Sequence, residues 1–218
     1  MDVLFEDDSI LVCYKPAGMA TQTKNIGEKD MESEVNNYLA SEHQPPSAKV
    51  VHRLDQPVEG VMVFAKNSDA ASKLTKQITE HTFKKKYYAI INREAFPNEG
   101  ELVDYLVKDN RTNLSKVVKD GDPRGKKAIL RYRVVEQWDD KKLLDIDLFT
   151  GRHHQIRIQL ASRTAPIVGD VKYGGISTGH NLALCSYHIG FNHPVTGEKM
   201  AFDIKPKGED FLDSKIAN

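Results

Sequence analysis

The middle of the chain is dominated by short segments that have the composition of β-strands. Four of them, rich in Val, Ile, Tyr and Leu, are Lys86–Ile91, Gly100–Val107, Ala128–Glu136 and Lys142–Phe149. Helical periodicity occurs elsewhere in the chain, so helices and strands do not alternate as they do in βαβ units. The sequence therefore predicts an α+β fold, in which a mixed, largely antiparallel sheet is flanked by helices and loops.

The remaining segments add further strands and the helices. Strands are predicted from apolar runs bounded by turn residues, over Val3–Phe5, Ile10–Tyr14, Val61–Ala65, Leu182–Phe191 and Lys199–Ile204. Amphipathic spacing predicts a helix over Met31–His43 and a second one that Ser68 caps at Asp69. His153–Ala161 is expected to be a short helix, although its apolar residues also alternate as in a strand. The glycine-rich stretch 174–179 is interpreted as a plain connector.

Length and composition fit one globular domain that spans residues 1–218. The chain has 218 residues, of which 39% are hydrophobic. It has no run of 18 apolar residues and no signal-peptide pattern at its start, so we expect a cytoplasmic protein with no membrane partner. Cys13 and Cys185 lack the spacing of a redox or zinc site and are expected to be small buried hydrophobes.

The charges are balanced overall but unevenly distributed. There are 31 Lys and Arg against 31 Asp and Glu. Residues 1–34 carry a net charge of −5, whereas residues 81–133 carry +6, including Lys84, Lys85, Lys86 and the cluster from Arg124 to Arg133. This region could bind phosphate groups, or it could be an ordinary solvated face.

A charged segment, His52-Arg53-Leu54-Asp55, lies next to the predicted buried strand Val61–Ala65. A carboxylate beside a core strand needs a cation or hydrogen-bond donors, because burial otherwise favours its protonated form. Asp55 could simply pair with Arg53 or cap a turn. It could also belong to an active site.

Two other segments carry groups that are common in active sites. Tyr87 and Tyr88 are adjacent on a predicted strand, so they point to opposite faces and only one can enter a given cleft. Thr150-Gly151-Arg152-His153-His154-Gln155-Ile156-Arg157 is rich in hydrogen-bond donors, and on a helix His154 and Arg157 would share one face. Adjacent histidines without an HExxH pattern do not favour a metal site.

Together these motifs resemble the RluA-type pseudouridine synthases. The resemblance covers residues 3–205, and it rests on the order of the motifs His52–Asp55, Lys85–Ala89, Thr150–Arg157, Pro166–Asp170, Tyr173-Gly174 and Leu182–Leu184. It implies the pseudouridine synthase fold with a central catalytic cleft. Many members also begin with a small S4-type RNA-binding domain, and this chain is expected to have no such N-terminal domain.

The resemblance also implies a reaction and roles for residues. Uridine in ribosomal or transfer RNA would be isomerised to pseudouridine without a cofactor or metal, by a protein expected to be a monomer. Asp55 would be the catalytic carboxylate, acting as a nucleophile or as the base of a glycal route, with Arg157 as its partner and Tyr87 stacked on the uracil. Contacts with the RNA are expected from His52, Arg53, Leu184, Lys84 and Lys85. Arg53 would hold the nucleotide that is flipped out of its stack.

One departure from the family pattern lies near the proposed site. Where the family usually has Thr-Ser-Gly, this chain has Val58-Glu59-Gly60, so Glu59 is expected to place a negative charge near the RNA. Two other functions remain as alternatives. The first is an inactive RNA-binding or ribosome-assembly module with the same fold. The second is a metal-dependent hydrolase built on His52, His153, His154 and Asp55.

Overall fold

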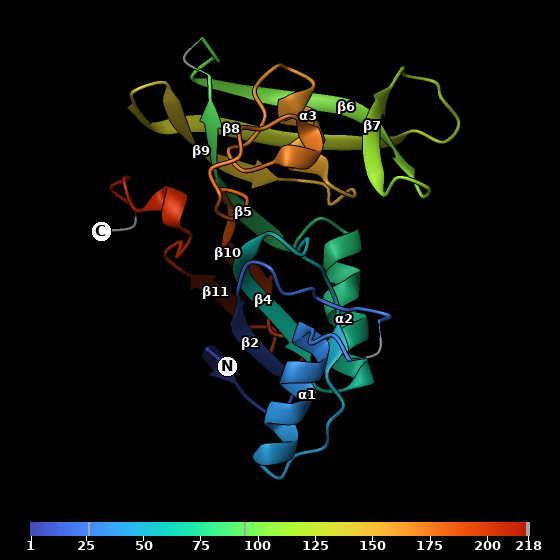
Figure 1. Ribbon diagram of the computed structural model, residues 1–218. Helices are drawn as coiled ribbons and strands as arrows, with labels where there is room; N and C mark the ends of the chain where they lie inside the picture. Colours follow the sequence, from blue (N-terminus) through green and yellow to red (C-terminus); the bar gives the residue numbers. More distant parts are fainter. Residues whose placement is uncertain (26, 94, 217–218) are drawn as a thin grey trace. The chain divides into compact units, whose positions relative to one another are not determined.

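The computed structural model describes residues 1–25, 27–93 and 95–216. The chain divides into two compact units, each made of two segments of sequence (Figure 1). Unit 1 comprises Met1–Lys84 and Ser186–Ile204, and unit 2 comprises Lys85–Cys185 and Lys205–Asn218.

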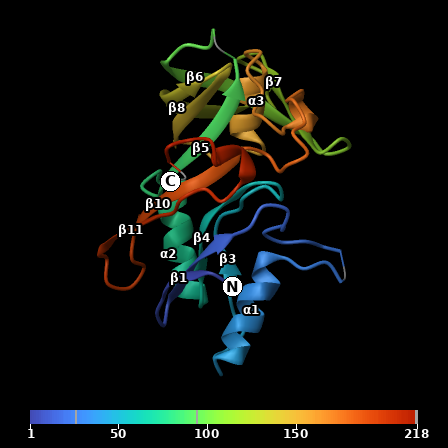
Figure 2. The same ribbon diagram turned by 60° about the vertical axis from the view of Figure 1, so that its left-hand side comes forward.

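Unit 1 is a sheet with two helices. Its strands are ordered β1 (Val3–Glu6), β2 (Ile10–Lys15), β4 (Glu59–Ala65) and β10 (Leu184–Asn192), with β3 (Lys49–Val50) on β4 and β11 (Lys199–Asp203) on β10. The pairs β1/β2, β2/β4, β3/β4 and β10/β11 are antiparallel, and the strands predicted over Val3–Phe5 and Ile10–Tyr14 form a hairpin. Helices α1 (Met31–Ser41) and α2 (Ser68–Thr79) flank these strands (Figure 2).

The core of unit 1 follows from the alternation of side chains along its strands. Val12 and Val63 pack in one cluster with Leu74 of α2, and all three are fully buried. The alternate residues Leu11 and Phe64 are also fully buried. The central strands are therefore covered on both faces, as the unbroken apolar run of β4 predicts.

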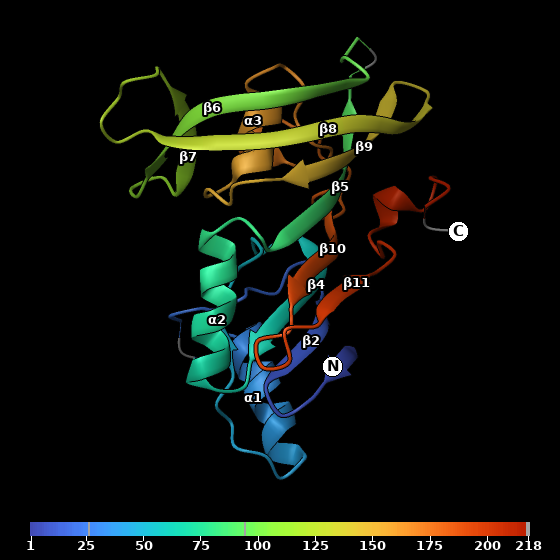
Figure 3. The same cartoon turned by 180° about the vertical axis from the view of Figure 1, so that it is seen from behind.

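Unit 2 is an antiparallel sheet with a short helix on one face. Its strands are ordered β5 (Lys84–Asn92), β9 (Lys141–Leu148), β8 (Lys126–Trp138), β6 (Glu99–Asp109) and β7 (Leu114–Val118). Helix α3 (Gln155–Ala161) lies behind β6 and β8 in Figure 3. Gln159 of α3 donates to the carbonyl of Leu102 at 3.2 Å, and this bond ties the helix to β6. Two short 3-10 helices, η1 (Val171–Tyr173) and η2 (Glu209–Phe211), complete the unit.

The α+β class and the largely antiparallel pairing are confirmed, with differences at the ends of elements. Asn67 is the N-cap of α2 and accepts from the amide of Ala70, so the expected cap by Ser68 was wrong. The helix predicted from His153 begins at Gln155, because His154 is in the left-handed region with φ of 53°. Cys13 and Cys185 are both fully buried, as expected.

Two aspects of the organisation remain predictions, namely a single domain over residues 1–218 and a central cleft. No helix within the described ranges is long and apolar enough to cross a membrane.

Candidate active site

The loop that carries Asp55 is fixed from both sides within unit 1. Thr21 is buried, accepts from the amide of Leu54 at 3.2 Å and donates to the carbonyl of the same residue at 3.0 Å. One residue beyond Asp55, the carbonyl of Gln56 accepts from the amide of Gly18 at 2.9 Å. The backbone is therefore held by hydrogen bonds on both sides of Asp55. The side chain of Asp55 is half-buried.

A buried lysine organises the turn that follows Asp55. Lys15, at the end of β2, is fully buried, and its ammonium donates to the carbonyls of Val58 at 2.6 Å, Pro16 at 2.9 Å and Gln56 at 3.2 Å. Burial lowers the pKa of Lys15 to about 8, although the charges of Asp55 and Glu59 act to raise it. Sequence reasoning missed this residue. A lysine that ends the apolar run Ile10–Tyr14 was the signal that could have identified it.

His52 and Arg53 have different environments although they are adjacent. The ring of His52 is buried, packs 5.4 Å from the ring of Phe83, and accepts through Nε2 from the amide of Val63 at 3.1 Å. This hydrogen bond ties the Asp55 loop to β4, and the RNA contact expected of His52 stays a prediction. Arg53 is exposed, as a residue that contacts RNA must be.

Glu59 departs from the family pattern, whereas Gly60 keeps the glycine of that pattern. Glu59 is 3% exposed and accepts a hydrogen bond from the hydroxyl of Tyr14 on β2. The expectation that it presents a charge to RNA was therefore wrong, since its carboxylate is turned into unit 1. Gly60 has φ of +150°, and a Cβ there would lie 2.5 Å from that of Ser186, so β4 can approach β10 only with glycine at this position.

The lysine run has three distinct environments. Lys84 is exposed. Lys85 is half-buried in unit 2, and its Nζ lies so near Gly151 that a Cβ there would be 3.1 Å away; burial lowers the pKa of Lys85. Lys86 is paired with Asp147 at 3.1 Å. Lys84 and Lys85 are therefore the members of the run that fit a role in phosphate binding.

The other predicted residues of unit 2 lie in its interior. Tyr87 is on β5, opposite Ile146 of β9, and is 6% exposed. Leu184, from which a contact with the RNA is expected, is 3% exposed. Arg157 is on α3 and is 3% exposed.

Arg157 forms a bidentate ion pair with a carboxylate that sequence reasoning did not single out, that of Asp170. Its Nε donates to Asp170 Oδ2 at 2.8 Å and its Nη2 to Asp170 Oδ1 at 2.7 Å. The Cζ atom of the guanidinium also lies 5.2 Å from the ring centre of Tyr173. The motif Gly169-Asp170-Val171-Lys172-Tyr173-Gly174 was noticed only as part of the resemblance, although an acid so close to a buried arginine in sequence was a usable signal.

The two histidines belong to the surroundings of Arg157. Their rings are stacked with centres 3.7 Å apart, and His154 Nδ1 lies 2.9 Å from the hydroxyl of Tyr173. Burial and the neighbouring Arg157 cation together lower the pKa of His154 to about 3, so the ring is neutral. Within the described parts of the chain, no group of three His, Cys, Asp or Glu side chains is arranged to hold a metal ion.

Most arginines of the basic cluster are already paired with carboxylates. Arg124 is 2.9 Å from Asp122, Arg131 is 2.6 Å from Glu101, and Arg133 is 2.9 Å from Asp145. Glu101 and Asp122 lie within residues 81–133 and are already subtracted in the net charge of +6, whereas Asp145 lies outside that segment. Of the three pairs, only that of Arg133 with Asp145 therefore brings in a carboxylate that the +6 counted along the sequence did not include.

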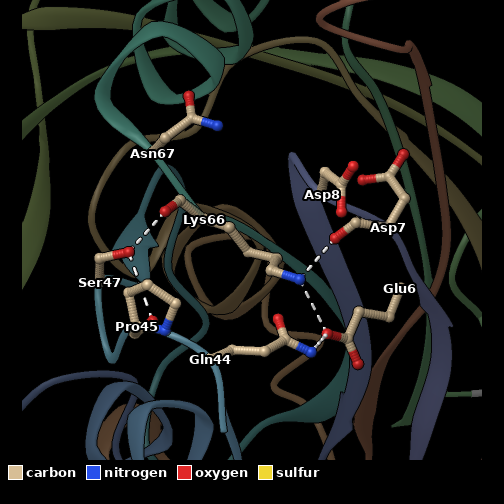
Figure 4. A pocket seen from close by; sticks show the side chains of 8 residues that line it. All are labelled: Glu6, Asp7, Asp8, Gln44, Pro45, Ser47, Lys66 and Asn67. Atoms are coloured by element: carbon tan, nitrogen blue, oxygen red, sulfur yellow. Dashed lines mark hydrogen bonds and ion pairs between the residues drawn. The ribbon is translucent and has the colours of Figure 1, made fainter. Parts of the chain in front are cut away.

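Unit 1 has a cavity of about 530 Å³, and none of the predicted site residues lines it (Figure 4). It is lined by Glu6, Asp7, Asp8, Gln44, Pro45, Ser47, Lys66 and Asn67. The Lys66 ammonium is held there by Glu6 at 2.8 Å and by the carbonyl of Asp7 at 2.6 Å. Because that lysine is held by its own neighbours, we assign no function to this cavity.

The sequence model of the RNA pseudouridylate synthase family matches residues 9–162. The chain belongs to this family. It is 34% identical over 205 residues to an uncharacterized RNA pseudouridine synthase of Bacillus subtilis, YhcT, covering 91% of this chain and 66% of the relative. It is 32% identical over 220 residues to ribosomal large subunit pseudouridine synthase D of Neisseria meningitidis serogroup B.

Coverage and fold complete the comparison. The Neisseria match covers 93% of this chain but only 57% of the length of the relative. The solved structure of human RNA pseudouridylate synthase domain containing 4 superposes with a TM-score of 0.78 at 22% identity, covering 94% of this chain and 89% of the human one. The fold of this family, which the sequence motifs implied, is thereby confirmed.

Proposed function

We propose that this chain is an RNA pseudouridine synthase in which Asp55 is the catalytic carboxylate. The observation that carries the proposal is the fixation of the Asp55 loop by Thr21 and Lys15, in a chain that belongs to this family. A carboxylate that attacks a sugar carbon or removes a proton must be held close to the reacting atom, and such placement supplies much of the rate enhancement.

Three residues are assigned to the chemistry. The glycosidic bond between uracil N1 and the ribose C1′ breaks, the base rotates, and a bond forms between C1′ and C5, after which the C5 proton is lost. Asp55 acts as the nucleophile or as the base of a glycal route. Tyr87 stacks on the uracil and assists removal of the C5 proton. Arg157 acts together with Asp55. The two hydrogen bonds from its guanidinium to Asp170 support a role that needs a fixed guanidinium.

Other residues are assigned to binding. Arg53 holds the flipped nucleotide, Leu184 gives the site an apolar wall, and Lys84 and Lys85 contact phosphates. His52 anchors the loop through Val63 and contributes to binding of the RNA beside Arg53. The reaction needs no cofactor, and the protein acts as a cytoplasmic monomer.

Large-subunit ribosomal RNA is the substrate that we propose to test first. The relatives in Neisseria meningitidis carry the name ribosomal large subunit pseudouridine synthase D, and one of them is 32% identical to this chain. Transfer RNA is the second substrate. An inactive RNA-binding module remains the alternative function, and it predicts RNA binding without product.

The proposal is tested by tritium release from RNA labelled at C5 of uridine. The wild-type chain is expected to release tritium from large-subunit ribosomal RNA. Asp55→Asn is expected to lower the rate by more than about a thousandfold, which corresponds to about 4 kcal/mol. Its unfolding temperature and RNA affinity should change little, because the substituted side chain keeps its size.

Asp69→Asn is the matched control in unit 1. Asp69 is an exposed carboxylate of α2 paired with Lys73, and its loss should leave the rate unchanged. Substantial residual activity in Asp55→Asn would refute the role of Asp55. RNA binding by the wild-type chain without tritium release from any RNA class would support the inactive module instead.

A further inference from the structure

The pair formed by Arg157 and Asp170 is among the most enclosed charged contacts in unit 2. The side chain of Arg157 is 4% exposed and that of Asp170 is 1% exposed. Two parallel hydrogen bonds use the Nε and Nη2 edge of the guanidinium, so they fix both its position and its plane. A lysine or a single hydrogen bond would leave the plane undetermined.

The backbone around Asp170 is itself tightly constrained. The carbonyl of Asp170 accepts from the amides of Gly175 at 2.8 Å and Tyr173 at 3.1 Å, and the amide of Asp170 donates to the carbonyl of Ile167 at 3.0 Å. A Cβ on Gly175 would lie 2.1 Å from the carbonyl oxygen of Ile167. The stretch 174–179 is therefore more than the plain connector expected from the sequence, because its second glycine is needed for the turn that aims Asp170.

Tyr173 supports the same guanidinium from another direction. Its ring lies under the Cζ atom of Arg157, and its hydroxyl accepts from the amide of Ser115 on β7 at 2.8 Å. The hydroxyl is also 2.9 Å from Nδ1 of His154. The aromatic face is thus attached at its far end to β7 and to the residue that precedes α3.

We propose that Asp170 and Tyr173 are positioning residues that hold the guanidinium of Arg157 in the orientation needed for uridine isomerisation. The inference rests on the proposed function, because it takes Arg157 to act on the reacting nucleotide together with Asp55. Asp170 sets the plane of the guanidinium and Tyr173 sets the face on which it rests. Neither residue needs to touch the RNA.

The experiment compares Asp170→Asn with a matched control, Asp104→Asn. Asp104 pairs with Arg163, just after α3, at 2.9 Å, so this control also removes an aspartate from an arginine pair in unit 2. We expect kcat for tritium release to fall about 100-fold in Asp170→Asn, the size of effect that a displacement of about 1 Å produces, while KM stays within about threefold. In Asp104→Asn, kcat should stay within about threefold of wild type.

A double variant separates positioning from folding. Asn at position 170 leaves the Arg157 cation buried without its counter-charge, which can unfold the protein. Arg157→Met combined with Asp170→Asn removes both charges and should restore the unfolding temperature. Its kcat should equal that of Arg157→Met alone, because Asp170 acts only through Arg157. A further loss of kcat in the double variant would overturn the inference, as would an unchanged kcat in Asp170→Asn.

A readout that is independent of activity distinguishes this inference from the proposed function. The Nε–H signal of Arg157 in a nitrogen-15 spectrum is assigned by its disappearance in Arg157→Met. Its proton should exchange slowly with water in wild type and in Asp104→Asn. In Asp170→Asn or, if that protein does not fold, in Tyr173→Leu, it should exchange faster. A protected signal in all folded variants refutes positioning. A wild-type chain with this pattern but without activity upholds positioning and refutes the proposed function.

Discussion

Replacing the buried Lys15 by Met is expected to change both stability and turnover. Lys15 is fully buried, and its ammonium donates to three backbone carbonyls, of which those of Gln56 and Val58 follow Asp55 in the chain. Met has a similar volume and an unbranched chain, so it fills the space without the charge. Those carbonyls would then lose their donor, and the turn that positions Asp55 would loosen.

The magnitude for stability follows from the pKa of Lys15. Burial lowers this pKa from 10.5 to about 8, and at 1.36 kcal/mol per pKa unit the folded state disfavours the charged form by about 3 kcal/mol. Between pH 8 and pH 10.5 the unfolded chain therefore binds more protons at Lys15 than the folded chain does. The free energy of unfolding of the wild type should rise with pH in this window, relative to that of Lys15→Met.

The assay is urea denaturation at pH 7, 8, 9 and 10, with kcat measured at pH 7. The difference in free energy of unfolding between wild type and Lys15→Met should be constant below about pH 8 and should then grow in favour of the wild type by up to about 3 kcal/mol. The exposed residue Lys24 provides the control, since Lys24→Met should show no such trend. A difference that is flat from pH 7 to pH 10 would refute the burial argument. An unchanged kcat would show that Lys15 does not position Asp55.

Two further predictions concern RNA binding. Replacing Lys84 and Lys85 by Gln should reduce the slope of log affinity against log salt concentration by about 0.9 for each phosphate that the protein no longer neutralises. Arg131→Gln should leave this slope unchanged, because Glu101 already neutralises Arg131. Equal slopes in both variants would place the RNA elsewhere. Arg53→Ala should lower turnover on a folded RNA far more than on a short single strand with the same target uridine. The reason is that flipping the base costs a few kcal/mol only when the base is stacked. Equal losses of turnover on the two substrates would assign Arg53 to the chemistry.

Much of the fold was predictable because its strands carry strong local signals. The strand β4 is an unbroken apolar run, and β1 and β2 are separated by an acidic turn. The two strands that were missed, β3 and β7, are only 2 and 5 residues long and are partly charged, so neither shows a clear alternation. Such strands form because a neighbouring strand offers hydrogen-bond partners, which is information from tertiary structure.

The motifs identified the residues of the candidate site but not what holds them. The contacts that fix the Asp55 loop join residues far apart in sequence, with Thr21 33 residues from Leu54 and Lys15 43 residues from Val58. No local pattern encodes such pairs. The left-handed conformation of His154, whose side chain contacts Tyr173 and the ring of His153, was not predicted either.

Glu59 shows why a departure from a family motif has to be interpreted in three dimensions. In the sequence it adds a negative charge beside the catalytic motif, whereas in the structure it is buried against Tyr14. Its charge raises the pKa of Lys15, as does that of Asp55, and both oppose the effect of burial. The buried amino group of Lys15 donates its hydrogen bonds most strongly when it is protonated. Glu59 therefore helps to keep Lys15 charged, and through Lys15 it stabilises the turn that presents Asp55.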